Sequence, residues 1–289
     1  MKIKPQRSGS AELLIAFKQA LDESLFVSKG DPARLFNLRC SQMPYCPRSV
    51  IVNYAIRGMF QAMDMRMAYY VAVGHAVHDV MQRYLALTGT LLADYTCREC
   101  GKKWPMSHKY ECCDLPTKYD EIEIRFKGIV GHIDAVFKDR QGRYWIVDFK
   151  TCSISGASTK KTNPGQNYMR QVKAYAYLLW KQYGIKVHGV MLMFLPRDNP
   201  WEPTIWEYVL NDERYEGAKA ELIRQRRIHK DTMNAKSLAD FRTLFKEKCN
   251  GPYCDMCKRE AKDLIEMVKS KIKKFPIIDQ QVEVEVSNA

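Results

Sequence analysis

Two acidic residues and a lysine lie close together in the middle of the chain and have the chemistry of a metal-dependent hydrolytic site. Asp134 stands near the end of one expected strand, and Asp148 and Lys150 stand at the end of the next, within the stretch Gly128–Thr151. Because side chains alternate between the two faces of a strand, Asp148 and Lys150 point to the same face and Phe149 to the other. Carboxylates hold Mg²⁺ or Mn²⁺, and an ammonium group stabilises charge on a phosphodiester. A β-hairpin with a surface salt bridge is the competing interpretation.

Two expected helices flank this stretch and offer further polar side chains. In the helix predicted over Met63–Leu87, His78 lies on an apolar stripe, where it is either a packed core residue or a ligand. In the helix predicted over Asn167–Gly184, Gln171 and Tyr175 are four residues apart and therefore share a face. That pair fits either an amphipathic helix with a buried tyrosine or a binding face directed at the strand ends.

The rest of the chain mixes strand and helix patterns. We expect a long strand or a strand pair at Glu121–Phe137, and further strands at Tyr144–Lys150, Val187–Pro196 and Ile205–Leu210. The segments Glu12–Phe26, Asn211–Lys248 and Glu260–Lys274 are expected to be helical. The arginines and lysines of Asn211–Lys248 fit a solvated helix face or a track for nucleic acid.

The composition narrows the class of protein and of partner. The 289 residues carry 46 Lys and Arg against 33 Asp and Glu, a formal charge of +13 that favours a polyanion such as nucleic acid. No stretch has the length of a transmembrane run, and the N-terminus lacks the apolar segment of a signal peptide. We therefore expect an intracellular, cytoplasmic protein that is neither secreted nor bound to a membrane.

Ten cysteines in an intracellular chain favour metal binding over disulfides. A first group lies in an expected insertion at residues 94–117, where a Cys-x2-Cys-Gly turn has the form of a zinc knuckle. Four ligands can be chosen from five residues: Cys97, Cys100, Cys112, Cys113 and, as a possible substitute, His108. A structural zinc ion is the prediction, and a basic loop with spare thiols is the alternative.

Taken together, four motifs resemble the PD-(D/E)XK nuclease superfamily, specifically its RecB-like branch. In chain order they are Gly74-x3-His78, Gly131-His132-Ile133-Asp134, Asp148-Phe149-Lys150 and Gln171-x3-Tyr175. The resemblance covers roughly residues 70–180. It implies an α/β fold in which a mixed β-sheet is flanked by helices.

The resemblance also implies roles for individual residues. His78, Asp134 and Asp148 would bind one or two Mg²⁺ or Mn²⁺ ions, with the main-chain carbonyl of Phe149 as a further ligand. Lys150 would position or activate the water and stabilise charge on the scissile phosphate. The residues that would position the DNA backbone are Gln171 and Tyr175.

A second group of cysteines resembles the cluster ligands of the iron–sulfur exonucleases of this branch, AddB and the CRISPR-associated adaptation nucleases. Cys46 would be the N-terminal ligand, and Cys249, Cys254 and Cys257 the C-terminal ones, of a 4Fe–4S cluster that joins the two flanks. The gaps of four and then two residues depart from those relatives. Zinc in place of the cluster, and Cys40 in place of Cys46, therefore stay open.

The implied function is a metal-dependent DNA exonuclease that hydrolyses phosphodiester bonds from DNA ends during recombination, repair or processing. Its substrate would be single-stranded DNA or duplex with ends, and a helicase or recombinase would be a partner. We expect a helical N-terminal flank at 1–62, a nuclease core at 63–210 and a basic helical flank at 211–289. The alternatives are a non-catalytic DNA-binding or assembly subunit and a restriction-type endonuclease.

Overall fold

The computed structural model describes most of the chain between residues 38 and 272. The described ranges are 38–39, 46–48, 51–52, 65–109, 111–197, 202–235, 238–246 and 255–272. The helix expected at Glu12–Phe26 and the cysteines Cys40, Cys249 and Cys254 lie outside these ranges.

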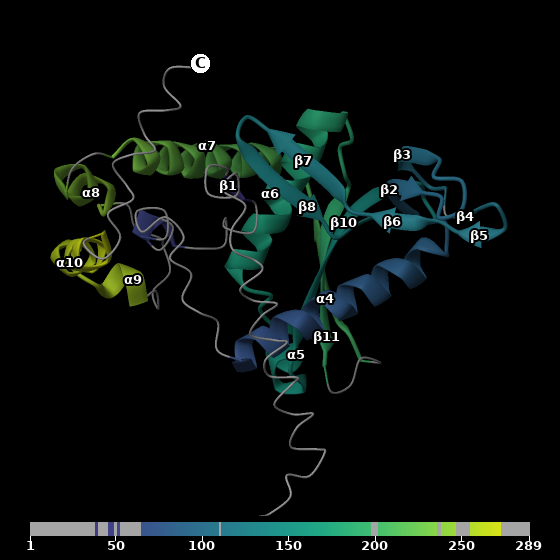
Figure 1. Cartoon of the computed structure of the whole chain (residues 1–289), viewed down its shortest axis with the longest axis horizontal. Helices are drawn as coiled ribbons and strands as arrows, with labels where there is room; N and C mark the ends of the chain where they lie inside the picture. Colours follow the sequence, from purple (N-terminus) through teal and green to yellow (C-terminus); the bar gives the residue numbers. More distant parts are fainter. Residues whose placement is uncertain are drawn as a thin grey trace, which may run out of the picture.

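A seven-stranded mixed sheet forms the centre of the molecule (Figure 1). Its order is β12-β11-β10-β9-β2-β3, and β6 also pairs with β2. Neighbours β10 and β11 run parallel, whereas the other pairs are antiparallel. The strands are β2 (Leu91–Thr96), β3 (Lys103–Ser107), β6 (Lys118–Asp120), β9 (Ala135–Lys138), β10 (Tyr144–Cys152), β11 (Gly189–Pro196) and β12 (Thr204–Val209).

Helices cover both faces of this sheet, as Figure 1 shows. Helix α6 (Gln166–Tyr183) packs on one face, where Ile146 of β10 belongs to the main apolar core. Helix α4 (Met65–Ala86) packs on the other face against Phe149, whose ring is fully buried. Burial of a side chain of this size stabilises the fold by roughly 1.5–3 kcal/mol. The predicted α/β fold with a mixed sheet between helices is confirmed.

The segment Glu121–Phe137, expected to be a long strand or a strand pair, contains three strands. β7 (Ile122–Phe126) and β8 (Ile129–Ile133) form a hairpin in a small separate sheet, in which β1 (Leu38–Arg39) pairs with β8. The chain then leaves that sheet at Asp134 and enters the central sheet as β9. Asp134 therefore lies at the junction of two sheets.

The cysteine-rich insertion grows out of the central sheet. Strand β2 pairs with β9 through Leu91 and Leu92, and its outer half pairs with β3 and β6. Two short strands, β4 (Glu111–Cys112) and β5 (Leu115–Pro116), form a hairpin beyond β3. The insertion is thus continuous with the sheet at its base.

The described C-terminal part is helical. It contains α7 (Asp212–Asn234), α8 (Leu238–Leu244), α9 (Asp255–Lys258) and α10 (Ala261–Ile272). Helix α7 begins where the side chain of Asn211 accepts a hydrogen bond from the backbone amide of Arg214, and it ends at Ala235, whose backbone is extended. The segment Asn211–Lys248, which we expected to be helical, contains two helices, α7 and α8, in its described part. A short helix that the sequence pattern did not predict, α5 (Ile154–Lys160), follows β10.

A second apolar cluster joins the two ends of the described chain. Ile51 and Val52 pack with Ile228 of α7, Phe245 near the end of α8 and Leu264 of α10. These N-terminal residues thus contact the C-terminal helices across more than 170 positions of sequence. The division into a core and two flanks stays a prediction.

Candidate active site

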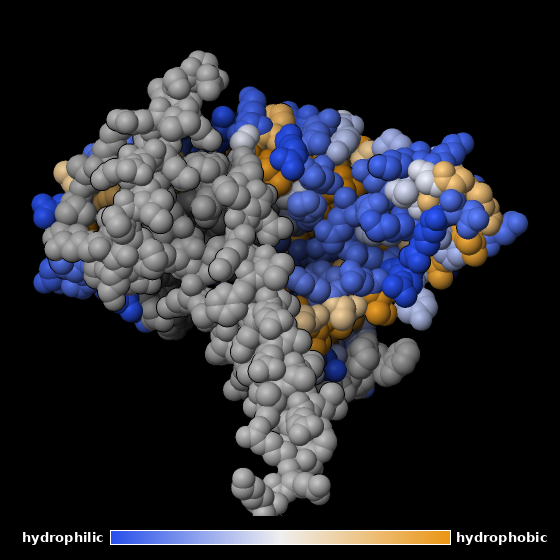
Figure 2. Space-filling model, viewed as in Figure 1, coloured by the Kyte–Doolittle hydropathy of each residue, from blue (hydrophilic) through white to orange (hydrophobic). Residues whose placement is uncertain are grey.

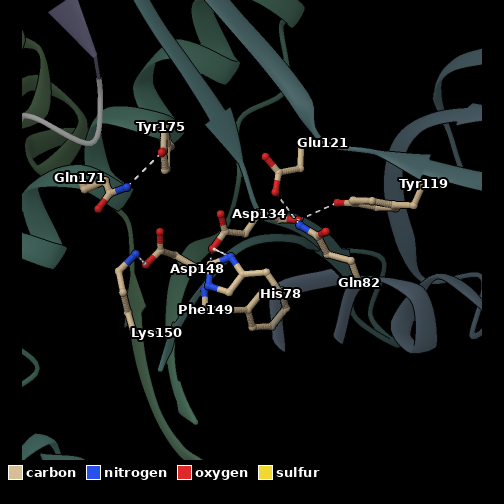
Figure 3. A network of polar contacts seen from close by, with 10 residues as sticks. All are labelled: His78, Gln82, Tyr119, Glu121, Asp134, Asp148, Phe149, Lys150, Gln171 and Tyr175. Carbon is tan, nitrogen blue, oxygen red and sulfur yellow. Dashed lines mark hydrogen bonds and ion pairs between the residues drawn. The ribbon is translucent and has the colours of Figure 1, made fainter. Parts of the chain in front are cut away.

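Asp134 stands at the centre of a group of polar side chains that three elements bring together (Figure 3). Its Oδ2 accepts a hydrogen bond of 2.8 Å from the backbone amide of Phe149 in β10. The same oxygen lies 3.5 Å from Nδ1 of His78 in α4. The helix, the junction of the two sheets and the central strand therefore meet at this carboxylate.

Asp148 is the most deeply buried charged residue of the group, with 1% of its surface exposed. Its Oδ2 lies 2.6 Å from Nζ of Lys150, and Oδ1 has no hydrogen-bond partner among the described residues. A buried carboxylate needs charged or hydrogen-bonding partners to offset its lost hydration. An oxygen left in this condition is a suitable ligand for a divalent cation.

Burial favours the neutral forms of Asp134, Asp148 and His78 and shifts their pKa values accordingly. Burial, and then the charge of Asp148, raise the pKa of Asp134 well above its usual value, and burial likewise raises the pKa of Asp148. Burial, followed by the charge of Lys150, lowers the pKa of His78 to about 4. His78 is therefore neutral at pH 7 and has a lone pair available for a metal. Two buried carboxyls that resist ionisation side by side are stabilised as anions by a bound cation.

Glu121 is a member of this group that the sequence pattern did not reveal. One ligand atom each from His78, Glu121 and Asp134 lie within 4.8 Å of one another, and Asp148 stands outside that tight set. Glu121 is held by Gln82, whose Nε2 donates to Glu121 Oε1 over 2.7 Å and to the Asp134 carbonyl oxygen over 2.9 Å. The carbonyl also accepts a 2.8 Å hydrogen bond from the hydroxyl of Tyr119.

The β7–β8 hairpin explains why Glu121 faces Asp134. Lys127 and Gly128 form its two-residue turn, both with positive φ, at 50° and 76°. Phe126 then pairs with Ile129, and the register continues outward to Ile122 opposite Ile133. The next position outward sets Glu121 against Asp134. A two-residue turn that ends in glycine is a hairpin signal in the sequence, and counting outward from it would have found the pair.

Gln171 and Tyr175 contribute from α6, on the side of the group where Lys150 lies (Figure 3). Nε2 of Gln171 donates a 3.0 Å hydrogen bond to the hydroxyl of Tyr175, and both side chains are buried. The expected shared face is therefore present. Figure 3 shows this pair in the same region as His78, Asp134, Asp148 and Lys150, and the roles of these residues stay predictions.

Comparison with known proteins places this arrangement in a family. A sequence profile described as the PD-(D/E)XK nuclease superfamily matches residues 41–260, more than half of the chain. The chain belongs to the PD-(D/E)XK nuclease superfamily. A search of curated proteins gave no significant match.

Solved structures with a distant likeness to this chain include SSO0001, with 16% identity and a TM-score of 0.42. The match covers 86% of this chain and 97% of that one. LHK-Exo in complex with dAMP has 11% identity, a TM-score of 0.43, and coverage of 70% and 93%. The alkaline exonuclease LHK-Exo from Laribacter hongkongensis has 10% identity, a TM-score of 0.41, and coverage of 73% and 95%.

The chain carries a second candidate metal site in its insertion. The four Sγ atoms of Cys97, Cys100, Cys112 and Cys113 lie within 4.8 Å of one another. The Sγ atoms of Cys100 and Cys112 are 3.9 Å apart, and those of Cys112 and Cys113 are 3.7 Å apart. Tetrahedral zinc with Zn–S bonds of about 2.3 Å separates its sulfurs by about 3.8 Å. The four thiols therefore fit a tetrahedral metal ion.

The backbone of the insertion shows how adjacent cysteines both reach this point. Cys113 and Asp114 have positive φ values of 52° and 58°, which turn the chain sharply after Cys112. On the opposite side, the backbone amide of Cys100 donates to Sγ of Cys97 over 3.4 Å. That bond is the main reason why the pKa of Cys97 falls to about 6. Cys97 is thus prepared to bind as a thiolate.

His108, the possible substitute ligand, lies elsewhere. Its ring stacks on Tyr144 with 6.1 Å between centroids, and Nε2 is 3.4 Å from the Tyr144 hydroxyl. It is not part of the four-cysteine group. The structure therefore favours the four cysteines over any set that includes His108.

The predicted iron–sulfur ligands are described only in part. Sγ of Cys46 lies 3.2 Å from Sγ of Cys257, although 211 positions separate them in the sequence. Nearby, the guanidinium of Arg48 donates a 2.6 Å hydrogen bond to the carbonyl of Arg259. The two flanks therefore meet at this pair of thiols.

In the described ranges, no helix combines the length and apolar character needed to cross a membrane.

Proposed function

We propose that this chain is a Mg²⁺- or Mn²⁺-dependent deoxyribonuclease that removes nucleotides from DNA ends. The observation that carries the proposal is the buried carboxylate of Asp148, beside Lys150 and close to the Asp134–His78 pair. The four motifs shared with the RecB-like branch support an exonuclease over other activities of the superfamily. A helicase or recombinase partner stays a prediction.

The site offers a complete set of ligands for a divalent cation. His78, Asp134 and Asp148 would hold the ion with the main-chain carbonyl of Phe149, and Glu121 adds a further carboxylate. When bound, the ion supplies a Lewis acid that polarises the phosphodiester and makes water a better nucleophile.

Lys150 acts on the phosphate as a cation. Burial opposes its charge, but the carboxylates of Asp148 and Asp134 outweigh burial and raise the pKa of Lys150. Because the Lys150 ammonium keeps its proton at neutral pH, it cannot act as a general base that takes a proton from water. Its role is therefore to donate hydrogen bonds and to stabilise the charge that develops on the scissile phosphate.

Gln171 and Tyr175 bind the DNA backbone on the Lys150 side. Their mutual hydrogen bond fixes both side chains, so that little conformational entropy is lost when a phosphate docks. The formal charge of +13 attracts DNA to the protein as a whole.

The deciding experiment compares end-labelled linear DNA with closed circular DNA, using protein prepared without oxygen and supplied with Mg²⁺ or Mn²⁺. We expect linear DNA to be degraded and circles to be spared, and Asp148→Ala to bind DNA without cutting it. Asp231→Ala, which removes an exposed carboxylate on α7, is the matched control. Cleavage by folded Asp148→Ala would refute the active site.

The same assay separates the two alternative functions. Cutting of closed circles at fixed sites would identify a restriction-type endonuclease. Binding without turnover on any DNA would identify a non-catalytic subunit.

We also propose a structural zinc ion at the four cysteines of the insertion and a second metal centre where the flanks meet. The proximity of Cys46 to Cys257 supports the second centre, and Cys249 and Cys254 would complete a 4Fe–4S cluster, with zinc as the alternative. Analysis of iron, acid-labile sulfide and zinc in the protein prepared without oxygen distinguishes the two metals.

A further inference from the structure

A cavity of about 570 Å³ lies between α4 and the cysteine-rich insertion. Its volume is that of pockets which hold small organic molecules. Its lining includes Gln82, Arg83, Leu87, Arg98, Leu115 and Tyr119. Figure 2 shows a largely hydrophilic surface on this part of the molecule, with hydrophobic residues gathered at the tip near β4 and β5.

The rim of this cavity is positively charged. Arg83, Arg98 and Lys118 stand against one lining carboxylate, that of Asp79. Lys118 is paired with Asp120 at 2.6 Å, whereas the two guanidinium groups have no ion-pair partner within the described ranges. Two exposed arginines at a pocket rim are suited to hold a phosphate group by paired hydrogen bonds.

Part of the cavity wall is apolar. Leu87 at the end of α4 is 44% exposed, and Leu115 of β5 is 45% exposed, although both are large hydrophobic residues. Both line the cavity. A flat apolar ligand that packs against them would remove this surface from water, which stabilises binding by about 25 cal/mol per Å². A ligand with a phosphate group at the arginines and a flat ring against the leucines has the chemistry of a nucleotide.

The cavity adjoins the active site through two shared side chains. Gln82 and Tyr119 line it, and both donate hydrogen bonds to the carbonyl oxygen of Asp134. A DNA strand whose scissile phosphate lies at Asp134 and Asp148 would therefore place a neighbouring nucleotide at the cavity.

We propose that this cavity binds one nucleotide of the DNA substrate next to the cleaved bond, with its phosphate on Arg83 and Arg98 and its base against Leu87 and Leu115. The inference rests on the proposed nuclease function and adds a substrate-binding site to it. The four cysteines hold the outer wall, because Arg98 lies between Cys97 and Cys100 and Leu115 follows two residues after Cys113.

The test measures the affinity of a labelled single-stranded oligonucleotide for the Asp148→Ala protein, with and without Arg83→Gln and Arg98→Gln together. We expect the double change to weaken binding by about tenfold or more and to lower the slope of log affinity against log salt by about 1.4, the value for two phosphate contacts on single strands. Arg140→Gln with Arg242→Gln removes the same charge from exposed positions away from the cavity and is the control.

Two outcomes separate this inference from the proposed function. If the wild-type protein cuts DNA and the cavity variant binds with the affinity and salt slope of the control, the cavity proposal is refuted and the nuclease stands. If the wild-type protein neither binds nor cuts DNA, both proposals fall. Because both arginines are exposed, we expect unchanged thermal unfolding in the variant.

A second measurement locates the nucleotide directly. 4-Thiothymidine is placed at successive positions of the oligonucleotide, crosslinked by light to the Asp148→Ala protein and mapped by mass spectrometry. We expect crosslinks to the peptide containing Leu115–Tyr119 from one position beside the cleaved bond. Crosslinks at that position to other peptides alone would overturn the proposal.

Discussion

Asp134 is joined to Phe149 by a 2.8 Å hydrogen bond in which the backbone amide of Phe149 donates to the Asp134 carboxylate. The bond connects the two acidic motifs of the site across 15 positions of sequence. It fixes the carboxylate beside the strand that carries Asp148 and Lys150. Asp134 thus has a structural role as well as the proposed role of metal ligand.

Replacements of Asp134 should separate these two roles. Asp134→Asn keeps an acceptor for the Phe149 amide but loses the charge, and we expect nuclease activity to fall roughly a thousandfold, because a bound cation supplies several kcal/mol of transition-state stabilisation. Asp134→Ala also leaves a buried N–H unpaired, and we expect it to lower the free energy of unfolding by about 1–3 kcal/mol more than Asp134→Asn. Equal stabilities by urea unfolding would contradict the structural role.

The buried carboxyl of Asp148 should make the metal-free protein sensitive to pH. Burial raises its pKa above the usual 3.8, so this group stabilises the folded state below about pH 4, and that contribution is lost as pH rises through the raised pKa. We therefore expect Asp148→Asn, which cannot ionise, to gain thermal stability relative to wild type as pH increases.

The measurement is the difference in melting temperature between the two proteins over a pH series in a chelating buffer. Asp231→Asn, at an exposed position on α7, should show no such trend. A difference between wild type and Asp148→Asn that does not vary with pH would contradict the argument. Added Mg²⁺ should stabilise the wild-type protein and leave Asp148→Asn largely unaffected.

Glu121 should contribute to metal affinity. Glu121→Gln keeps an oxygen that can accept from Gln82 but removes a charge from the group with His78 and Asp134. We expect Mn²⁺ affinity, measured by calorimetry, to fall by about tenfold, within the range for residues that support metal ligands. Glu207→Gln, on the exposed face of β12, is the control, and equal Mn²⁺ affinities for the two variants would exclude this role.

The cysteine insertion should lose its metal when one ligand is removed. Cys100→Ser is expected to abolish zinc in the purified protein while iron content is unchanged, because Cys46 and Cys257 form a separate pair. Cys152→Ser, outside both cysteine groups, should retain zinc. Zinc retained in Cys100→Ser after dialysis against a chelator would show that the insertion binds no metal at this point.

The Gln171–Tyr175 pair on α6 should affect DNA cleavage more than metal affinity. Tyr175→Phe removes the hydroxyl that accepts a 3.0 Å hydrogen bond from Gln171. We expect kcat/KM to fall by about tenfold, the equivalent of one hydrogen bond of about 1.4 kcal/mol, with Mn²⁺ affinity unchanged. Tyr177→Phe on the same helix, whose ring packs on Trp180, should have little effect. A loss of Mn²⁺ affinity in Tyr175→Phe would assign the pair to the metal site instead.

Sequence alone determined the features that depend on local pattern. The alternation of β10 predicted that Asp148 and Lys150 share a face opposite Phe149, since the period of two is a property of any strand. The helix predicted over Asn167–Gly184 lies at Gln166–Tyr183 and ends at Gly184, whose left-handed conformation, with φ of 73°, favours glycine. The Cys-x2-Cys-Gly turn likewise indicated the knuckle, because its form depends only on residues that are adjacent in the chain.

Only the tertiary structure decided which distant groups meet. The Lys127–Gly128 turn could have paired Glu121 with Asp134 from the sequence, but only the fold brings His78 and Gln82 of α4 to that pair. The break of the expected strand at Asp134 was equally hidden, because side chains of Gln82 and Tyr119 take the place of a neighbouring strand at its carbonyl. These contacts link separate elements, and no local periodicity encodes them.

The cysteines show the same division. Their number and spacing predicted metal binding, with His108 as a possible substitute for one cysteine. Folding directed His108 to Tyr144 and gathered the four thiols, with the positive φ of Cys113 making adjacent ligands possible. The sequence shows which residues have the chemistry to bind a metal. Which of them lie close enough to share one metal ion depends on the whole fold.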